Sequence, residues 1–327
     1  MRSPKEMHLT SAELGYLWTG YSINEMSKWY LTVFREQAED EEIKDLYTHA
    51  LESANEILVE RKKLLNNDGY PNAIGFFETD IDKSSSKLFS DRFLLHYLHK
   101  GTRLGLEFHS KALASATRVD IRTYHRNCVL STLQLHERVV DMLLNKGVYW
   151  RTPTLPAPAT PEYIQKPDYL NGWQGDKRPI NSMELANLYQ IMDLLMIIET
   201  MCRGFSQTSD SDEIVDLFQK GIKVAKKQYH VLSELLEKDD LPIAPSLAAE
   251  ITDSKKRVLS DRIMVTHVAG LLGSLLSQYG FSLGAAMKHD LVTTYSAQTV
   301  KAGAFSEKIT RFLIENEWLE KVPGAKS

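Results

Sequence analysis

The sequence predicts an all-α protein made of two tandem four-helix bundles. Three observations predict this: the two halves of the chain align with each other, each half has four long stretches with apolar residues at helical spacing, and helix-start signals recur at equivalent places. The chain has 327 residues, which suits two domains of ordinary size. Its 43% hydrophobic and 25% charged residues are typical of a globular protein.

The internal repeat is clearest over residues 89–153, which align without gaps on residues 259–323 at an offset of 170. The front of each half aligns at an offset of 171. Six of the eleven prolines lie between the two copies, where they block helix continuation. We therefore expect a first bundle over residues 1–150, a connector rich in proline and aromatic residues over 151–180, and a second bundle over 181–327. The aromatic residues of the connector predict that it packs down.

The periodicity also predicts the topology of each bundle. Short joins make the first and second helices of each half an antiparallel hairpin, and the third and fourth likewise. About 20 residues separate the second helix from the third, and an extended chain of that length reaches about 66 Å, longer than a helix of about 39 Å. One long crossover between two hairpins is the ferritin-like arrangement. The expected helices cover residues 11–38, 41–66, 90–116, 120–146, 182–207, 211–238, 261–287 and 290–317.

Matched carboxylates have a structural interpretation. Glu13 and Glu184 each stand three residues after a capping residue, Thr10 or Asn181, which is the capping-box pattern. Asp120 and its repeat partner at position 290 are interpreted as caps of the fourth helices. These acids are thereby assigned to the fold and not to chemistry.

Charge and cysteine content exclude several classes of protein. The net charge of −4 points neither to nucleic acid nor to an anionic membrane. Arg118, Arg122 and Arg126 form a short basic stripe, interpreted as a solvated helix face. Cys128 and Cys202 are too few for a disulfide framework or a thiolate metal site, and the first 30 residues lack a signal-peptide pattern. A reducing cytoplasm is the expected location.

Residues 263–287 contain no Asp, Glu, Lys or Arg and are long enough to span a bilayer. We expect no membrane span, because the repeat partner of this segment in the first half carries several charges. Its four glycines predict close helix packing. This segment and residues 191–201 should be more buried than their first-half counterparts.

Several segments together resemble a known family: "LTSAELGYLW", "LFSDRFLLHYL", "NGWQGDKRPINSMEL", "KDDLPIAPS" and "IENEWLEKVP". The chain is similar to domain-of-unknown-function family 3231 of endospore-forming Firmicutes over nearly its whole length. The resemblance implies a ferritin-like fold, a likeness to spore-coat F-like proteins and a sporulation or stress setting, including the forespore or spore. It implies no established activity, catalytic residue or cofactor.

A ferritin-like bundle raises the question of a di-metal site. Such sites use Glu-x-x-His motifs on two helices, and the sequence contains none. A polar cluster inside the first bundle is the alternative, with Glu25 buried and hydrogen-bonded to Tyr, Arg or His and with no bound metal. Its candidate residues are Glu25, His96, His99, His125 and His136.

Arg92 and Glu137 stand at similar heights on neighbouring helices, and the repeat places Arg262 and Glu307 at the equivalent positions. The sequence therefore predicts two structural ion pairs, Arg92 with Glu137 and Arg262 with Glu307. Catalysis is the less favoured interpretation of these residues.

Three functions fit these patterns. The leading one is a non-catalytic structural or interaction scaffold, with self-association or an unidentified protein partner, because no nucleophile motif, phosphate loop or dinucleotide fingerprint is present. The second is a binding module for a small apolar ligand. The third is a metal-dependent or redox enzyme that uses the histidines of the first bundle. No cofactor is predicted.

Overall fold

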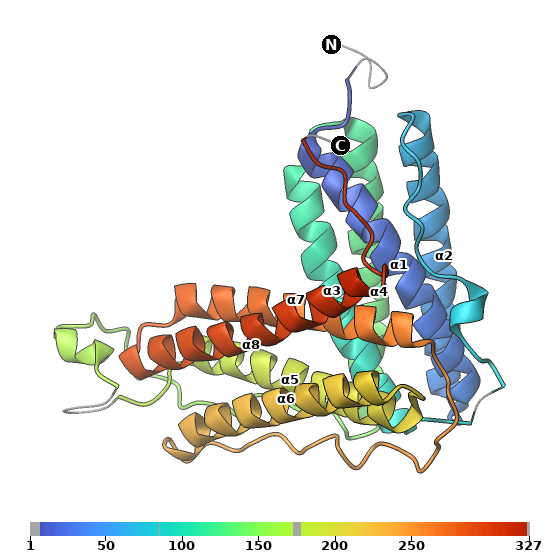
Figure 1. Cartoon of the computed structure of the whole chain (residues 1–327). Helices are drawn as coiled ribbons and strands as arrows, with labels where there is room; N and C mark the ends of the chain where they lie inside the picture. Colours follow the sequence, from blue (N-terminus) through green and yellow to red (C-terminus); the bar gives the residue numbers. More distant parts are fainter. Residues whose placement is uncertain (1–6, 85, 173–177, 326–327) are drawn as a thin grey trace. The chain divides into compact units, whose positions relative to one another are not determined.

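A computed structural model describes residues 7–84, 86–172 and 178–325 (Figure 1). Over these residues the chain folds into eight α-helices and two short 3-10 helices with no strand, which confirms the all-helical tandem repeat. Every α-helix begins and ends within two residues of its predicted bounds. The helices are α1 Ser11–Gln37, α2 Glu41–Asn67, η2 Glu78–Asp80, α3 Asp91–Ser115, α4 Val119–Asn145, η3 Pro167–Leu170, α5 Ser182–Thr208, α6 Asp212–Glu237, α7 Asp261–Ala285 and α8 His289–Glu315.

The chain divides into two compact units. Unit 1 contains residues 1–149, together with residues 252–264 and 316–327 from the second half, and unit 2 contains residues 150–251 and 265–315. Two segments of the second half thus belong to unit 1 by their contacts.

In unit 1, α1 packs against α2 and α3 packs against α4, with further contacts of α2 with α4 and of α1 with α3. The connector between α2 and α3 runs back along the bundle, so that α2 and α3 point the same way (Figure 1). A buried aromatic layer fills the end of the bundle where α3 begins. Phe34 lies at its centre, with its ring edge-to-face against Tyr47, Phe89 and Tyr97.

The second-half segments of unit 1 are fixed by polar contacts. Asp80 is buried and accepts hydrogen bonds from the Ser260 hydroxyl at 2.6 Å and from Arg262 Nη2 at 2.7 Å. Ile81 and Leu259 form an antiparallel β-bridge beside this pair. Burial alone would raise the pKa of Asp80, but the hydrogen bonds from Arg262 and Ser260 lower it.

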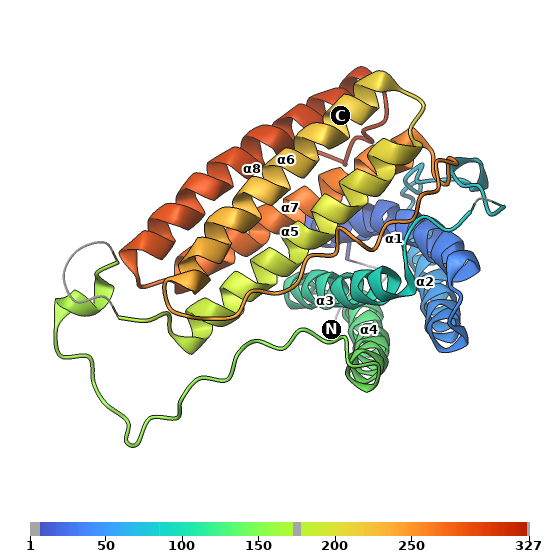
Figure 2. The same ribbon diagram turned by 90° about the horizontal axis from the view of Figure 1, so that it is seen from below.

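In unit 2 the four helices α5–α8 lie along one another (Figure 2). Of the 27 residues in α5, 18 are buried, against 13 of the 27 in α1, which confirms the predicted deeper burial. Within the described chain, α5 is the one helix long and apolar enough to cross a membrane, but 72% of that apolar window is buried inside the protein. Burial of this kind is typical of the core helix of a bundle.

Helix α7 differs from the expectation. It buries 11 of its 25 residues and α3 buries 10, so the absence of charge does not make α7 an interior helix. The predicted close packing at its glycines is wrong: Gly270, Gly273, Gly280 and Gly284 are exposed, and a Cβ atom at any of them would meet nothing within 4 Å. The physical reason is that α7 lacks charged residues on its exposed face as well as on its buried face.

The connector between the halves does not pack down over its described part. Most of residues 151–170 are exposed, and Tyr163 is 94% exposed. Tyr169 is held near the start of α5, where the Arg178 guanidinium lies 4.1 Å from its ring centroid. Trp173 lies outside the described residues.

Candidate functional site

A buried carboxylate fixes one end of unit 1. Glu13 accepts hydrogen bonds from the backbone amides of Thr10, Thr117 and Arg118, each at 2.8 Å, and from the hydroxyls of both threonines. Burial alone would raise the pKa of Glu13, but these amides outweigh it and lower the pKa to about 2. Glu13 thus completes the predicted capping box and also ties the start of α1 to the turn between α3 and α4.

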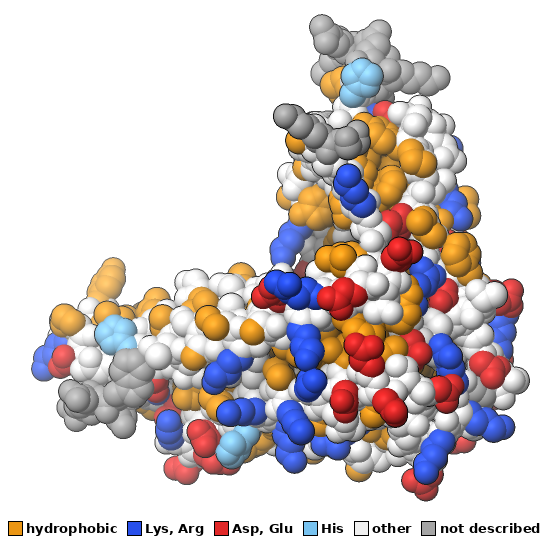
Figure 3. Space-filling model, in the orientation of Figure 1, with side chains coloured by type: hydrophobic (Ala, Val, Ile, Leu, Met, Phe, Trp, Pro, Cys, Tyr) orange, Lys and Arg blue, Asp and Glu red, His pale blue; other side chains and the backbone are white. Residues whose placement is uncertain are grey.

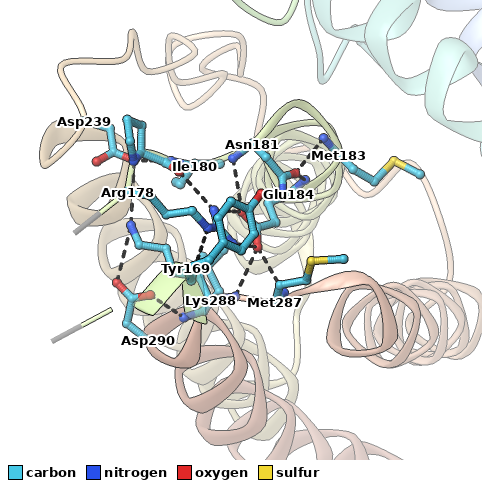
Figure 4. Close-up of polar contacts among 12 residues, drawn as sticks. Tyr169, Arg178, Ile180, Asn181, Met183, Glu184, Asp239, Met287, Lys288 and Asp290 are labelled. Atoms are coloured by element: carbon cyan, nitrogen blue, oxygen red, sulfur yellow. Dashed lines mark hydrogen bonds and ion pairs between the residues drawn. The ribbon is translucent and has the colours of Figure 1, made fainter. Parts of the chain in front are cut away.

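Unit 2 repeats the arrangement with Glu184 (Figure 4). Its carboxylate accepts from the amides of Met287 and Lys288 at 3.0 and 3.2 Å, and from both terminal nitrogen atoms of Arg178 at 2.7 and 2.8 Å. The amide of Asn181 completes the capping box at 3.1 Å. Burial would raise the pKa of Glu184, but Arg178 and these amides lower it. The carboxylate is therefore ionised and fully used by the fold.

Near Glu13 and near Glu184, a basic side chain forms ion pairs with two aspartates. In unit 1, Arg118 pairs with Asp68 at 2.5 Å and with Asp120 at 2.6 Å. In unit 2, Lys288 occupies the equivalent position, 3.9 Å from Asp239 and 3.8 Å from Asp290.

The assignment of Asp120 and Asp290 as helix caps is corrected. The N-cap residue of α4 is Arg118, whose side chain makes no capping hydrogen bond. Asp120 lies two residues further along, where its carboxylate accepts hydrogen bonds from Arg118 and from the amide of Ile121. Arg118 is buried and Arg126 is exposed, so the predicted basic stripe is not one solvated face. Arg118 instead stabilises the fold through its ion pairs with Asp68 and Asp120.

The predicted ion pairs Arg92 with Glu137 and Arg262 with Glu307 stay predictions. Arg262 forms an ion pair with Asp80, and Glu307 forms one with Arg311, one turn along α8, at 2.7 Å. Glu137 is exposed on α4. Similar height along neighbouring helices does not fix which way a long side chain points.

The histidines of the first bundle separate into groups. His99 stacks on His136 with ring centroids 5.3 Å apart, and Tyr149 meets His99 edge-on at 5.4 Å. His136 Nδ1 lies 2.9 Å from the Thr102 hydroxyl. His96 is buried on α3. No group of three or more His, Cys, Asp or Glu side chains within the described chain is placed to hold a metal ion.

Glu25 lies in a different environment from these histidines. It is buried, accepts from the Tyr21 hydroxyl at 3.2 Å, and lies 3.5 Å from the ammonium of Lys62 and 3.7 Å from that of Lys28. The predicted hydrogen bond to a tyrosine is therefore present, with two lysines that the sequence did not suggest.

The interior of unit 1 holds a second polar cluster to which all four helices contribute. Arg61 of α2 is fully buried, and its Nε donates to the Tyr124 hydroxyl of α4 at 2.6 Å. His109 of α3 and His125 of α4 face each other with their Nδ1 atoms 3.4 Å apart. On α1, Gly20 makes room for the guanidinium, since a Cβ atom there would overlap Arg61 Nη1. We call these five residues the Arg61 cluster.

The Arg61 cluster carries the positive charge of Arg61 and is buried. Burial, the Arg61 charge and the neighbouring His125 lower the pKa of His109 to about 3, and burial with Arg61 lowers that of His125 to about 4. Both imidazoles are therefore neutral at pH 7. Burial raises the pKa of the adjacent Cys128 thiol despite Arg61, so this cysteine is protonated and inert. A metal cation is disfavoured beside the fixed charge of Arg61.

These two histidines predict how stability depends on pH. Their pKa values in the folded protein lie below the ordinary value of about 6.5, so the unfolded chain binds more protons once the pH falls below that value. The free energy of unfolding should decrease by about 1 to 3 kcal/mol for each histidine as the pH falls from 7 to 4. Replacing His125 with asparagine should flatten this part of the curve in urea titrations. The control His230→Asn, at an exposed position on α6, should leave the slope unchanged; an unchanged slope in His125→Asn would contradict the burial argument.

The second half has apolar or neutral residues at the equivalent positions. Leu232 replaces Arg61, Ile191 replaces Gly20, and both are fully buried. Tyr279 and Tyr295 replace the two histidines, and the Tyr279 hydroxyl donates to Gln228 at 2.8 Å. At these positions unit 1 has a buried charge and unit 2 has none.

Of the Arg61 cluster, the sequence predicts only His125 as a site residue. Arg61 is not predicted, because charged residues usually lie on the surface. A signal was present: it lies three residues after Leu58 and three before Leu64, on the apolar face of α2. A charged residue inside an otherwise apolar helix face is the pattern that could have found it.

Comparison with known proteins agrees with the sequence resemblance. A family model described as "Protein of unknown function (DUF3231)" matches residues 2–160 and again residues 169–327. The chain belongs to this family. The two matches of the DUF3231 model correspond to the two halves of the chain, as the internal repeat predicted.

The crystal structure of a protein from Bacillus halodurans C-125, described as a "putative spore coat protein", is also similar to this member of the DUF3231 family. The sequence identity is 19% and the TM-score 0.41, and the match covers 47% of this chain and 100% of the other. No curated protein matches the chain in sequence.

Proposed function

We propose that the protein is a non-catalytic helical scaffold that assembles through the outer face of α7 with a second copy of itself. The observation that carries this proposal is an exposed helix face without charge. Gly270, Gly273, Ser277, Gly280 and Phe281 are all exposed on it, and Phe281 is 66% exposed. Figure 3 shows white and orange side chains along most of the upper edge of this unit, where α7 lies. Solvent-facing helix surfaces normally carry charges.

The chemistry of this face supports association between like surfaces. Small residues allow two helices to approach closely, and an uncharged face meets its own copy without like-charge repulsion. A two-fold interface of this kind is the commonest one in soluble oligomers. The buried carboxylates Glu13 and Glu184 support a non-catalytic role, since each is occupied by backbone amides.

We further propose that each half is a ferritin-like bundle, supported in unit 1 by the parallel course of α2 and α3 on either side of a long connector (Figure 1). The cytoplasm or the forming spore is the proposed setting, on the family resemblance alone. These points add to the scaffold proposal and do not depend on it.

The proposal predicts that the protein self-associates and that one charge on the α7 face prevents it. In sedimentation equilibrium, the wild-type chain should form a dimer at micromolar concentration, and Ser277→Glu should weaken the dimer at least tenfold. Ser277 is exposed, so this change should alter stability by less than about 0.5 kcal/mol. Ser296→Glu, at an exposed position on α8, is the matched control. A monomeric wild type, or equal dimerisation by Ser277→Glu, would reject the proposal.

A further inference from the structure

The guanidinium of Arg61 lacks partners for most of its donors. Its Nε is bonded to Tyr124, but Nη1 and Nη2 are buried without a hydrogen-bond partner anywhere in the described chain. Charged side chains are almost never fully buried unless they are paired, because removing a charge from water costs several kcal/mol. The fork formed by Nη1 and Nη2 is the part of arginine that binds two acceptor oxygen atoms in parallel.

No acidic side chain supplies those acceptors. Arg61 forms no ion pair within the part of the chain that the structure describes, and the polar groups around it are the neutral His109, His125, Tyr124 and Cys128. The Nε2 atom of His125 is likewise buried without a partner among the described residues. Buried nitrogen atoms without a partner, on two different helices, therefore lie within one cluster.

We infer that unit 1 binds a small monovalent carboxylate-type anion at the Arg61 cluster. The Nη1 and Nη2 atoms of Arg61 donate to its two oxygen atoms, and an imidazole N–H of the cluster provides a further donor. One fixed positive charge selects one negative charge, since a dianion would leave an uncompensated charge in the interior. Tyr124 and Cys128 belong to an apolar cluster with Leu17 and Leu64, and such surroundings strengthen a charge-assisted hydrogen bond.

Unit 2 provides an internal comparison. Leucine, isoleucine and two tyrosines occupy the equivalent positions there, and the side-chain oxygen of Gln228 is already used by Tyr279. These positions of unit 2 carry no positive charge, so the expected stoichiometry is one anion per chain. This site is independent of the α7 face, and either can fail without the other.

Thermal unfolding of the full chain tests the inference. Sodium formate is titrated against sodium chloride and sodium sulfate at constant ionic strength. Formate should raise the folding equilibrium constant in a saturable way, by about 100-fold at 100 times its dissociation constant. Arg61→Leu introduces the residue that unit 2 has at this position, and it should abolish the formate response. Arg61→Lys should weaken formate binding at least tenfold, because the ammonium lacks the planar fork. Arg138→Leu removes an exposed arginine of α4 and is the matched control, with a full response.

The histidines provide a second measurement. Under formate, the imidazole C–H proton resonances of His109 and His125 should shift in the wild type and in Arg138→Leu, with the same midpoint as the stabilisation. An equal response of wild type and Arg61→Leu, or no saturable response in the wild type, would overturn the inference in favour of a guanidinium solvated only by water. Equal protection by chloride would overturn the carboxylate assignment. If Arg61→Leu does not fold, Arg61→Lys and the histidine resonances decide.

Discussion

Replacing Glu184 with alanine is expected to lower the free energy of unfolding by about 3 to 5 kcal/mol. The change leaves the Arg178 guanidinium without its counter-charge, and it removes the acceptor of the amides at positions 287 and 288. A buried donor that loses its partner costs about 1 to 3 kcal/mol. Urea unfolding followed by circular dichroism measures the difference.

Two controls separate the contribution of the fold from that of charge. Glu307→Ala removes an exposed carboxylate that is paired only with Arg311, and it should cost less than about 1 kcal/mol. Glu184→Gln keeps the size and one acceptor oxygen and should fall between the two. If Glu184→Ala were no more destabilising than Glu307→Ala, the carboxylate would not be the tie between α5 and the α7–α8 turn.

The second large effect is expected at Gly20. A methyl group there would overlap Arg61 Nη1 and lie 2.5 Å from the central guanidinium carbon, so Gly20→Ala must displace the buried charge. We expect a loss of about 1 to 3 kcal/mol of unfolding free energy, the usual cost of overpacking a core. In the Arg61→Leu background the same change should be neutral or stabilising by up to about 1 kcal/mol, because alanine favours a helix over glycine.

The double-mutant cycle isolates this contact. A coupling energy of about 2 kcal/mol between positions 20 and 61 is expected, measured by urea unfolding of the four proteins. Gly101→Ala, at an exposed position on α3 with nothing within 4 Å of its Cβ, is the control and should not couple to Arg61. Additive effects at Gly20 and Arg61 would show that the guanidinium does not occupy the space beside Gly20.

Local sequence signals predicted the helices well. The bounds follow from capping and periodicity, which act over a few residues, and the capping boxes at Glu13 and Glu184 are where the sequence places them. The deeper burial of α5 followed from its apolar composition. The same reasoning failed for α7, because a chain without charges does not reveal which of its faces is covered.

Long-range pairing could not be predicted in the same way. The repeat gave no reason for residues 252–264 to join unit 1, because their main polar partner, Asp80, lies in an irregular connector. Of the five residues of the Arg61 cluster, only His125 was predicted. The sequence pointed to histidines in the first bundle, but which of them lie together depends on how each helix is rotated about its axis. The charged residue of the cluster, Arg61, lies on an apolar helix face, where a charge is not expected.

Native mass spectrometry with elemental analysis of the protein purified from its own host is the most direct test of a non-catalytic scaffold. The expected result is a dimer with no stoichiometric iron, manganese or zinc, since Glu13 and Glu184 are bonded to backbone amides and the Arg61 cluster is positive. The same preparation of Ser277→Glu should give the mass of one chain. A metal ion bound once or more per chain, retained in that variant, would contradict the scaffold and make the protein a candidate metalloenzyme.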